Sequence, residues 1–279
     1  MAYKSFFSVL TDETLVLPVL DYAITAAKAY DAHLDVLCVG VDRSQAGYYY
    51  AGASALVLEQ TINRAQEEAK AIEAAVRARL GKSDIRWSCD TGMAQLADLT
   101  RHVANRARFS DMAILPQPYG PNRGAEVEPA TEACLFDGRT PALVIPDDAG
   151  PFVRPRKIVV GWNESAEALD AVRAALPLLR DAHTVHVAVI DPPVQGPNRS
   201  DPGGALSQYL ARHGVKVEVD VLAKTLPRIS DVLVRHARDV DAEMIVMGAY
   251  GRSRFREAVF GGATRYMLEQ APLPVLMAH

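Results

Sequence analysis

The chain contains the same pattern of secondary structure twice, and this internal repeat limits its fold more than any other feature of the sequence. Lys4–Asp12 and Arg156–Asn163 are both short apolar runs that end in polar residues, which is typical of buried strands leaving a sheet. A helical pattern and a second apolar run follow each of them: Leu17–Tyr30 with Leu34–Asp42 in the first copy, and Ala166–Arg180 with Thr184–Asp191 in the second. Alternation of strands and helices predicts β-α-β units and a parallel sheet.

The correspondence continues to the end of each copy. In the first copy the remaining predicted elements are a strand at Ser83–Ser88, a helix at Leu96–Ala107 and strands at Ser110–Leu115 and Thr140–Pro146. Their counterparts in the second copy are Val215–Leu222, Ile229–Ala237, Ala242–Met247 and Leu273–Ala278. The sequence therefore predicts an α/β protein of two tandem domains, each an open, twisted, doubly wound parallel sheet of Rossmann-like type.

The join between the copies and one length difference define the domain organisation. We expect domains at residues 1–148 and 156–279, joined by a linker at 149–155 that contains Gly150, Pro151 and Pro155. Asp12 matches Asn163 at an offset of 151 positions, whereas Pro141 matches Pro274 at 133, so the first copy is longer by 18 residues. The extra length falls in Arg43–Gly81, which holds three consecutive tyrosines, Tyr48 to Tyr50, and a helical run, Val57–Leu80. These tyrosines could stack on a ligand, but we expect them to serve packing or an interface.

Composition excludes several classes of protein. Apolar residues make up 49% and charged residues 23% of the 279, which is typical of globular chains. No apolar run approaches the roughly 20 residues that span a bilayer, and no secretory signal is evident, so we expect a cytoplasmic protein without a membrane partner. Three cysteines without a C-x-x-C spacing indicate buried thiols in a reducing compartment. The net charge of −4 argues against nucleic acid as a partner.

A glycine-containing segment in the second copy predicts an anion site. The fourth strand runs into Gly248 and Gly251, and after nine further residues Gly261 and Gly262 precede a helix. Glycines let backbone N–H groups approach a phosphate, and a helix N-terminus adds unpaired donors and partial positive charge. Thr264 could add a hydroxyl. Arg252, Arg254, Arg256 and Arg265 raise the local positive potential, and the cluster from Arg252 to Arg256 either contacts phosphate or forms a solvated loop face.

With this segment in view, the whole chain resembles a tandem universal stress protein of the UspA-like family. Nucleotide-binding members of that family carry G-x2-G-x9-G-[S/T]; Gly248, Gly251 and Gly261 fit this spacing, and Gly262 stands where the family has Ser or Thr. The resemblance implies that ATP or a related adenine nucleotide binds the second domain as a regulatory ligand, with Mg²⁺ able to accompany it. The implied phosphate-side residues are Met247, Gly248, Gly251, Arg252, Gly261, Gly262, Ala263 and Thr264.

The adenine side of the family site can also be carried over. An acidic residue usually ends the first strand in the family, and here Asn163 follows Gly161 and Trp162 at that place. Asn163 keeps hydrogen-bonding capacity without the charge. Val189 stands where the family has an apolar residue that lines the adenine.

The first copy departs further from the family pattern. Pro116, which has no N–H to offer a phosphate, occupies the place of Gly248, and Tyr119 lies near that of Gly251. The stretch Glu126–Asp137 is acidic and would repel phosphate, although Asp12 keeps the acid after strand one. We expect the first copy to be nucleotide-free and mainly structural.

The remaining sequence motifs do not indicate an enzyme or a metal site. No P-loop, G-x-G-x-x-G or G-x-S-x-G occurs, and no catalytic residue stands out, so we expect at most slow ATP hydrolysis. A metal pair of His183 and His186 is disfavoured because residues three apart on a strand face opposite ways, and His236 has no acid beside it in sequence. We therefore assign no metal ligands from the sequence.

Two functional alternatives remain open beside the regulatory nucleotide. One is a nucleotide-free interaction or scaffold protein of the same fold, which Asn163 and Gly262 favour; the other is an enzyme acting on an adenylated substrate. The family resemblance further implies pairing of domains through their last strands, as an internal pseudo-dimer or a homodimer, and a role in the stress response with an unidentified protein partner.

Overall fold

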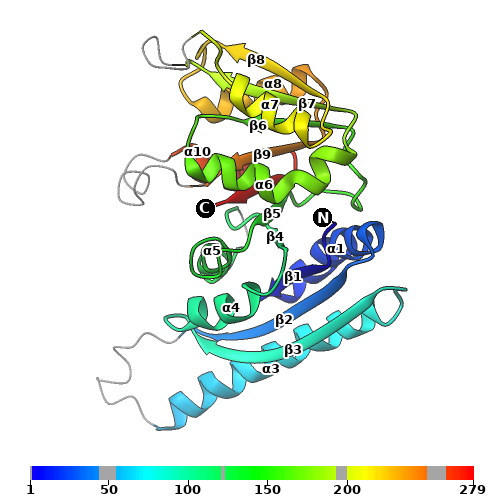
Figure 1. Cartoon of the computed structure of the whole chain (residues 1–279). Coiled ribbons are helices and arrows are strands. Elements are labelled where there is room, and N and C mark those ends of the chain that lie inside the picture. The colour runs from blue at the N-terminus through cyan, green and yellow to red at the C-terminus, as the bar shows by residue number, and fades with distance from the viewer. Residues whose placement is uncertain (1, 44–54, 121–122, 193–199, 250–261) are drawn as a thin grey trace. The chain divides into compact units, whose positions relative to one another are not determined.

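The computed structural model describes residues 2–43, 55–120, 123–192, 200–249 and 262–279 (Figure 1). These residues form two compact units. The N-terminal unit comprises Tyr3–Thr140 with Gly150–Phe152, and the C-terminal unit consists mainly of Pro141–Ala149 and Val153–His279. The three tyrosines at 48–50 lie outside the described residues.

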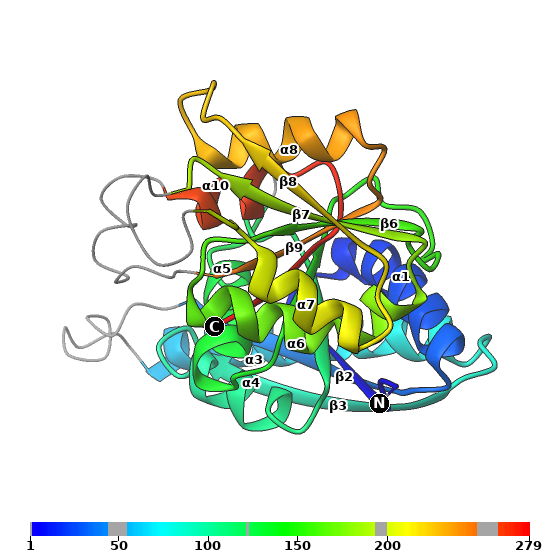
Figure 2. The ribbon, with the colours of Figure 1, turned by 45° about the horizontal axis from the view of Figure 1, so that its top comes forward.

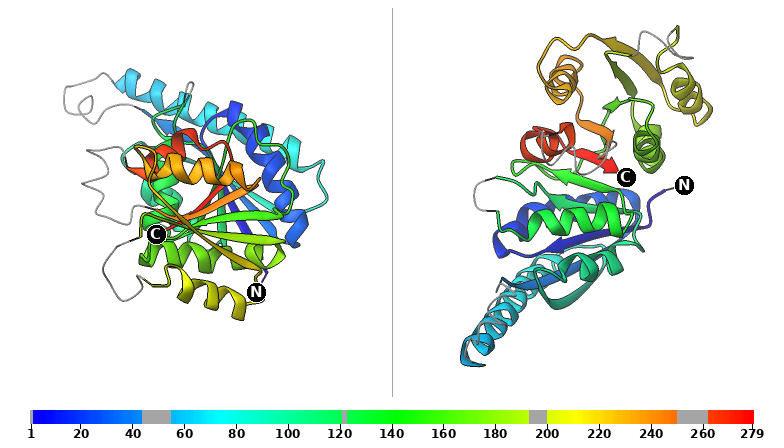
Figure 3. Two further views of the ribbon diagram at one scale, coloured as in Figure 1. Left: turned by 90° about the horizontal axis from the view of Figure 1, so that it is seen from above. Right: turned by 90° about the vertical axis from the view of Figure 1, so that its left-hand side faces the viewer.

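The N-terminal unit is a parallel sheet with the strand order β3-β2-β1-β4. Helices α1 and α3 pack together on one face, and α4 and α5 lie on the other (Figures 1 and 3). Its elements are β1 Ser5–Leu10, the short helix η1 Glu13–Leu15, α1 Val16–Tyr30, β2 His33–Asp42, α3 Ala55–Leu80, β3 Arg86–Gln95, α4 Leu99–Ala107, β4 Met112–Pro116, α5 Val127–Glu132 and η2 Ala133–Asp137.

Burial explains why the central strands were easier to locate than the edge strand. β1 is buried along nearly its whole length, as expected for a central parallel strand covered on both faces. β3 lies at the edge of this sheet and alternates between exposed and half-buried residues. The strand expected at Ser83–Ser88 begins later, at Arg86, because the residues after α3 form a turn in which the Ser83 N–H donates to the Leu80 carbonyl.

The C-terminal unit holds a sheet in the order β5-β10-β9-β6-β7-β8. Helices α6 and α7 cover one face, and α8 and α10 cover the other (Figure 2). Its elements are β5 Ala142–Ile145, β6 Lys157–Gly161, α6 Ala166–Asp181, β7 Thr184–Ile190, α7 Gly204–Arg212, β8 Val217–Leu222, α8 Ile229–Asp239, β9 Met244–Gly248, α10 Ala263–Gln270 and β10 Val275–Ala278. The expected α/β fold with mostly parallel open sheets is confirmed.

The last strand of the first repeat belongs to the C-terminal unit. β5 pairs antiparallel with β10, with Val144 opposite Val275 and Leu143 opposite Leu276. The two last strands thus pair as the family resemblance implied, and the compact units do not coincide with the repeat boundary expected after residue 148. Among the described helices, none combines the length and the hydrophobicity needed to cross a membrane.

Candidate functional site

The candidate site of the C-terminal unit lies where its strand order reverses. β6 is the first strand of the repeat, and the chain continues from it to β7 and β8 on one side and then to β9 and β10 on the other. β6 and β9 are parallel neighbours, with Gly161 opposite Met247. In open α/β sheets, ligands bind in the crevice outside the carboxyl ends of strands at this switch point. Of the expected site residues, those described at the ends of these strands, 161–163 and 247–248, are therefore brought to one edge.

The residues after β6 form a self-contained turn into α6. The Trp162 N–H donates to the Ala188 carbonyl at 3.0 Å, which extends the pairing with β7 by one residue. The exposed Asn163 accepts the Ser165 N–H at Oδ1 over 3.2 Å, and Ser165 Oγ in turn accepts the Ala168 N–H at 3.1 Å as the N-cap of α6. The amide oxygen of Asn163 is thus engaged in the turn, and its NH₂ group can still donate to a ligand.

Gly248 has a packing role that the motif spacing did not reveal. A Cβ atom at this position would lie 2.5 Å from the backbone nitrogen of Ala168 and 2.7 Å from the carbonyl carbon of Glu167. Any side chain would therefore collide with the first turn of α6, whose backbone cannot move aside without displacing the helix. Gly161 is less tightly placed, since its Cβ would meet Leu233 Cδ2 at 3.2 Å.

The apolar residues expected near the adenine are covered to different degrees. Val189 on β7 is only 5% exposed and packs beside Gly203, where an added Cβ would lie 3.2 Å from Val189 Cγ2. Met247 is half-buried on β9, opposite Met277 of β10. The side chain of Val189 is thus mostly covered by the start of α7.

On the phosphate side, the structure describes only the start of α10. Gly262 is the N-cap of this helix, and Ala263 is its first residue. Thr264 is 2% exposed, as is Thr131, which stands 133 positions earlier at the matching place in the first repeat. Thr264 is therefore covered by its surroundings, and its expected contact with phosphate stays a prediction. Gly251, Arg252 and Gly261 lie outside the described residues, as do Arg254 and Arg256.

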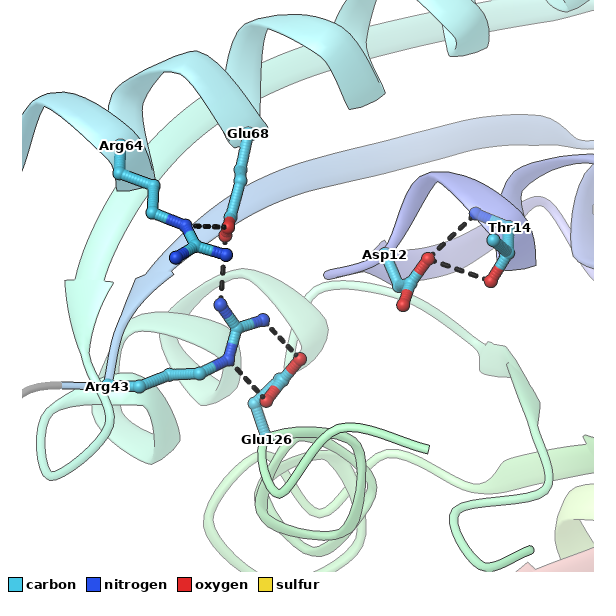
Figure 4. Close-up of polar contacts among 6 residues, drawn as sticks. All are labelled: Asp12, Thr14, Arg43, Arg64, Glu68 and Glu126. Carbon is cyan, nitrogen blue, oxygen red and sulfur yellow. Dashed lines mark hydrogen bonds and ion pairs between the residues drawn. The ribbon is translucent and has the colours of Figure 1, made fainter. Parts of the chain in front are cut away.

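The matching edge of the N-terminal unit carries an ion-pair cluster instead of a glycine segment (Figure 4). Arg43, immediately after β2, donates through Nε and Nη2 to the carboxylate of Glu126 at 3.2 and 2.8 Å, and through Nη1 to Glu68 at 2.9 Å. The Glu126 side chain is 1% exposed. Its hydrogen bond raises the pKa of the Arg43 guanidinium above the ordinary arginine value.

The other expected features of this edge have structural partners as well. Asp12 caps η1, accepting at Oδ1 the Thr14 N–H at 2.8 Å and the Thr14 hydroxyl at 2.7 Å (Figure 4). Pro116 ends β4, and the Tyr119 hydroxyl donates to Glu128. The acidic stretch thus forms ion pairs and hydrogen bonds within its own unit.

Known proteins resemble both units in fold and the C-terminal unit in sequence. Residues 155–279 match the sequence model of the Universal stress protein family. The C-terminal part of the chain is thus similar to universal stress proteins in sequence. The chain is also 28% identical, over 138 residues, to the Universal stress protein Slr1230 of Synechocystis sp.. The matched part makes up 49% of this chain and 46% of that relative, so the chain spans about half the length of the curated relative it matches.

Solved structures extend the likeness of fold to both halves. A universal stress protein from Archaeoglobus fulgidus aligns with 98% of this chain and 95% of its own, at a TM-score of 0.67 and 12% identity. A putative universal stress protein from Pseudomonas aeruginosa aligns with 99% of this chain and 93% of its own, at 0.60 and 16%. A universal stress protein in complex with cAMP aligns with 45% of this chain and 97% of its own, at a TM-score of 0.35 and 22% identity.

Two groups of interacting side chains were not predicted from the sequence. Arg43 and Glu126 are 83 positions apart, and the acidic character of Glu126–Asp137 gave only a partial signal. His186 and His236 both contact one carboxylate, that of Asp220 on β8. No sequence spacing connects these three residues, since they come from two strands and a helix.

Proposed function

We propose that the C-terminal universal stress domain binds ATP or a related adenine nucleotide as a regulatory ligand at the carboxyl edge of β6 and β9. The observation that carries this proposal is the topology of that edge, where two neighbouring parallel strands end at the switch point. α6 begins directly after β6, and α10 follows β9 and leads back to the parallel strand β10, so both helices start at this edge. Helix N-termini are suited to anions.

The phosphates would lie against the start of α10. Because Gly262 has no side chain, no hydroxyl or carboxylate at the N-cap covers the first N–H groups of this helix. Arg265, which is exposed in the first turn, adds positive charge. Gly248, Gly251, Arg252 and Gly261 complete the phosphate side in this proposal.

The nucleoside would lie against the end of β6. Here the exposed Asn163 offers its NH₂ group to ribose or adenine, and the half-buried Gly161 and Trp162 flank it. Mg²⁺ accompanying the phosphates would prefer carboxylate oxygens. The amide of Asn163 is a weaker partner than the acid usual in the family, so most ligands of the ion would come from the phosphates and water.

Substitutions at Gly262 test this proposal without disturbing the fold. Gly262 has an ordinary φ of −58°, and both Ser and Asp are favoured N-cap residues, so Gly262→Ser and Gly262→Asp should each preserve or stabilise α10. The oxygen of an N-cap Ser engages one N–H of the helix, but its hydroxyl proton can still be donated to phosphate. A net gain of one hydrogen bond worth about 1 kcal/mol would tighten ATP binding roughly fivefold. Asp places a negative charge at the same point and should weaken binding at least tenfold.

Isothermal titration of ATP into the full chain distinguishes the outcomes. Opposite shifts in Kd for the two variants, at equal thermal stability, support the proposed site. Equal affinity in both variants and the wild type would place the nucleotide elsewhere, and the absence of measurable binding in all three would refute the function.

A second candidate is a nucleotide-free interaction protein, and one observation favours it. Gly248 and Asn163, two of the residues expected at the ligand, both have roles in packing and turn formation that need no ligand. Mass spectrometry of small molecules released on denaturing the purified protein separates the candidates, because a regulatory ligand of high affinity should copurify in amounts comparable with the protein.

A further inference from the structure

Two histidines and an aspartate converge inside the C-terminal unit, and none of the three is among the residues of the proposed nucleotide site. His186 Nδ1 and His236 Nε2 each lie 2.9 Å from the same atom, Oδ2 of Asp220. The three potential ligand atoms lie within 4.8 Å of one another. Both histidines are 9% exposed, and the Asp220 side chain is 27% exposed, so the cluster is enclosed but reachable from solvent on one side.

The fold explains why these three side chains meet. β7 and β8 are parallel, with His186 opposite Glu218 and Ala188 opposite Asp220. Because alternate residues on a strand share a face, Glu218 and Asp220 point to the same side of the sheet, and His186 lies beside them. His236 comes from the buried face of α8, which packs over β7 on that side (Figure 2).

Hydrogen bonding alone satisfies the cluster when both facing nitrogens carry protons, because one carboxylate oxygen can accept two hydrogen bonds. The same three groups are also the donor set that divalent transition metals prefer, since imidazole nitrogen and carboxylate oxygen both bind Zn²⁺ at about 2.0–2.2 Å. Around a tetrahedral ion with such bonds, neighbouring ligand atoms lie about 3.3 Å apart. Admitting an ion would therefore need the two contacts to open from 2.9 Å by a few tenths of an ångström. The two histidine nitrogens, which lie within 4.8 Å of each other, would have to adjust to the same spacing, as rotation of the imidazole rings allows.

A fourth ligand position is also at hand. Glu218 Oε2 lies 3.9 Å from His186 Nδ1, and the Glu218 side chain is 65% exposed and able to turn. Water can fill the same position, because Asp220 is partly open to solvent. The cluster thus has three enclosed donors and an accessible fourth side, which is a common arrangement for zinc.

We propose that His186, Asp220 and His236 form a binding site for a divalent transition-metal ion, with Glu218 or water as the fourth ligand. β8 is the edge strand of its sheet and pairs with β7 alone among the described strands. An ion held by β7, β8 and α8 would cross-link this edge to the rest of the unit. The site is independent of the nucleotide proposal, since it shares no residue with it.

The test uses the full chain after removal of metals with a chelator, with Zn²⁺ as the titrant in calorimetry and Co²⁺ as a spectroscopic probe. We expect one Zn²⁺ per chain and a tetrahedral Co²⁺ spectrum without a thiolate charge-transfer band, which excludes the cysteines as ligands. His236→Gln and Asp220→Asn should each weaken Zn²⁺ binding at least a hundredfold. His183→Gln is the matched control, because His183 is exposed, lies three positions from His186, and should bind Zn²⁺ as the wild type does.

Chemical denaturation of the metal-free variants shows whether each one folds. Zn²⁺ should raise the unfolding midpoint of the wild type and of His183→Gln, and should leave the midpoints of the two cluster variants unchanged. Full-affinity binding in His236→Gln and Asp220→Asn, or an equal loss in His183→Gln, would overturn the proposal. Destabilised cluster variants combined with no Zn²⁺ binding by the wild type would show a hydrogen-bonded cluster only, and would overturn it as well.

Discussion

Replacing Arg43 by methionine should destabilise the N-terminal unit strongly, because it leaves the carboxylate of Glu126 buried without its partner. Glu126 is 1% exposed, and Arg43 contacts both of its oxygens (Figure 4). Breaking a buried ion pair by removing one partner generally costs about 3–5 kcal/mol. Two unit charges about 4 Å apart attract by about 4 kcal/mol at an effective dielectric constant of 20.

Solvent reduces this figure, since the Arg43 side chain is 43% exposed. We therefore expect a loss of about 2–3 kcal/mol in the free energy of unfolding. For a unit of this size each kcal/mol corresponds to about 3–4 °C in Tm, so Arg43→Met should lower the transition by roughly 6–12 °C. Differential scanning calorimetry of the full chain measures this shift.

Arg64→Met is the matched control. Arg64 pairs with Glu68 at 3.1 Å across one helical turn, but its side chain is 81% exposed, so the loss should be about 0.3–0.5 kcal/mol. Adding Glu126→Gln to Arg43→Met removes the buried charge and should restore at least half of the lost stability. An Arg43→Met loss no greater than that of Arg64→Met, or a further loss in the double variant, would refute the reasoning.

Further predictions concern a glycine, the thiols and a histidine. Gly248→Ala should cost about 1–3 kcal/mol in urea unfolding, because its Cβ would lie 2.5 Å from the backbone of α6, whereas Gly150→Ala, which meets nothing within 4 Å, should be nearly neutral. Burial raises the pKa of Cys134 to about 12, whereas a hydrogen bond from the neighbouring Cys38 thiol lowers the pKa of Cys89. Iodoacetamide at pH 8 should therefore label Cys89 first and Cys134 only after denaturation, which peptide mass mapping would show. Burial and, to a smaller extent, the nearby Arg106 lower the pKa of His102, so the unfolded chain binds more protons near pH 6 than the folded chain does. The free energy of unfolding should therefore fall on acidification from pH 7.5 to 5.5. Thermal scans of His102→Gln should show a weaker dependence on pH.

The fold was largely predictable because burial and periodicity act locally. Long amphipathic helices such as α1 and α6, and apolar strands such as β1, were placed within one or two residues of their bounds. The short helices α5 and α7 were not anticipated. α5 spans six residues and contains Pro129, and α7 begins at Gly204 directly after Pro202 and Gly203, which are typical of turns. The family resemblance was confirmed, and the expected pairing of the last strands appears as β5 with β10.

The site was less predictable because its contacts join distant positions. The spacing of the glycine segment predicts a site at the carboxyl edge of β6 and β9, but it does not reveal that Gly248 makes room for α6. The same limit applies to His186 and His236, which looked isolated in sequence and meet at Asp220 only through the pairing of β7 with β8. The spacing of residues predicts contacts within one helix or strand, whereas these contacts depend on which helices and strands become neighbours in the fold.

The two repeats show how one backbone frame can carry different chemistry at equivalent places. Thr131 and Thr264 are both buried on corresponding helices, so both repeats keep a threonine at this place. The difference lies in charge: the first repeat places Glu126 before its helix and neutralises it with Arg43, whereas the second has Gly262 as N-cap and an exposed Arg265. A phosphate at the first edge would have to displace a buried carboxylate from its guanidinium partner, and at the second it would meet helix N–H groups and positive charge. Because displacing the Glu126 carboxylate from Arg43 costs free energy, an anion that binds at either edge should prefer the edge in the second repeat.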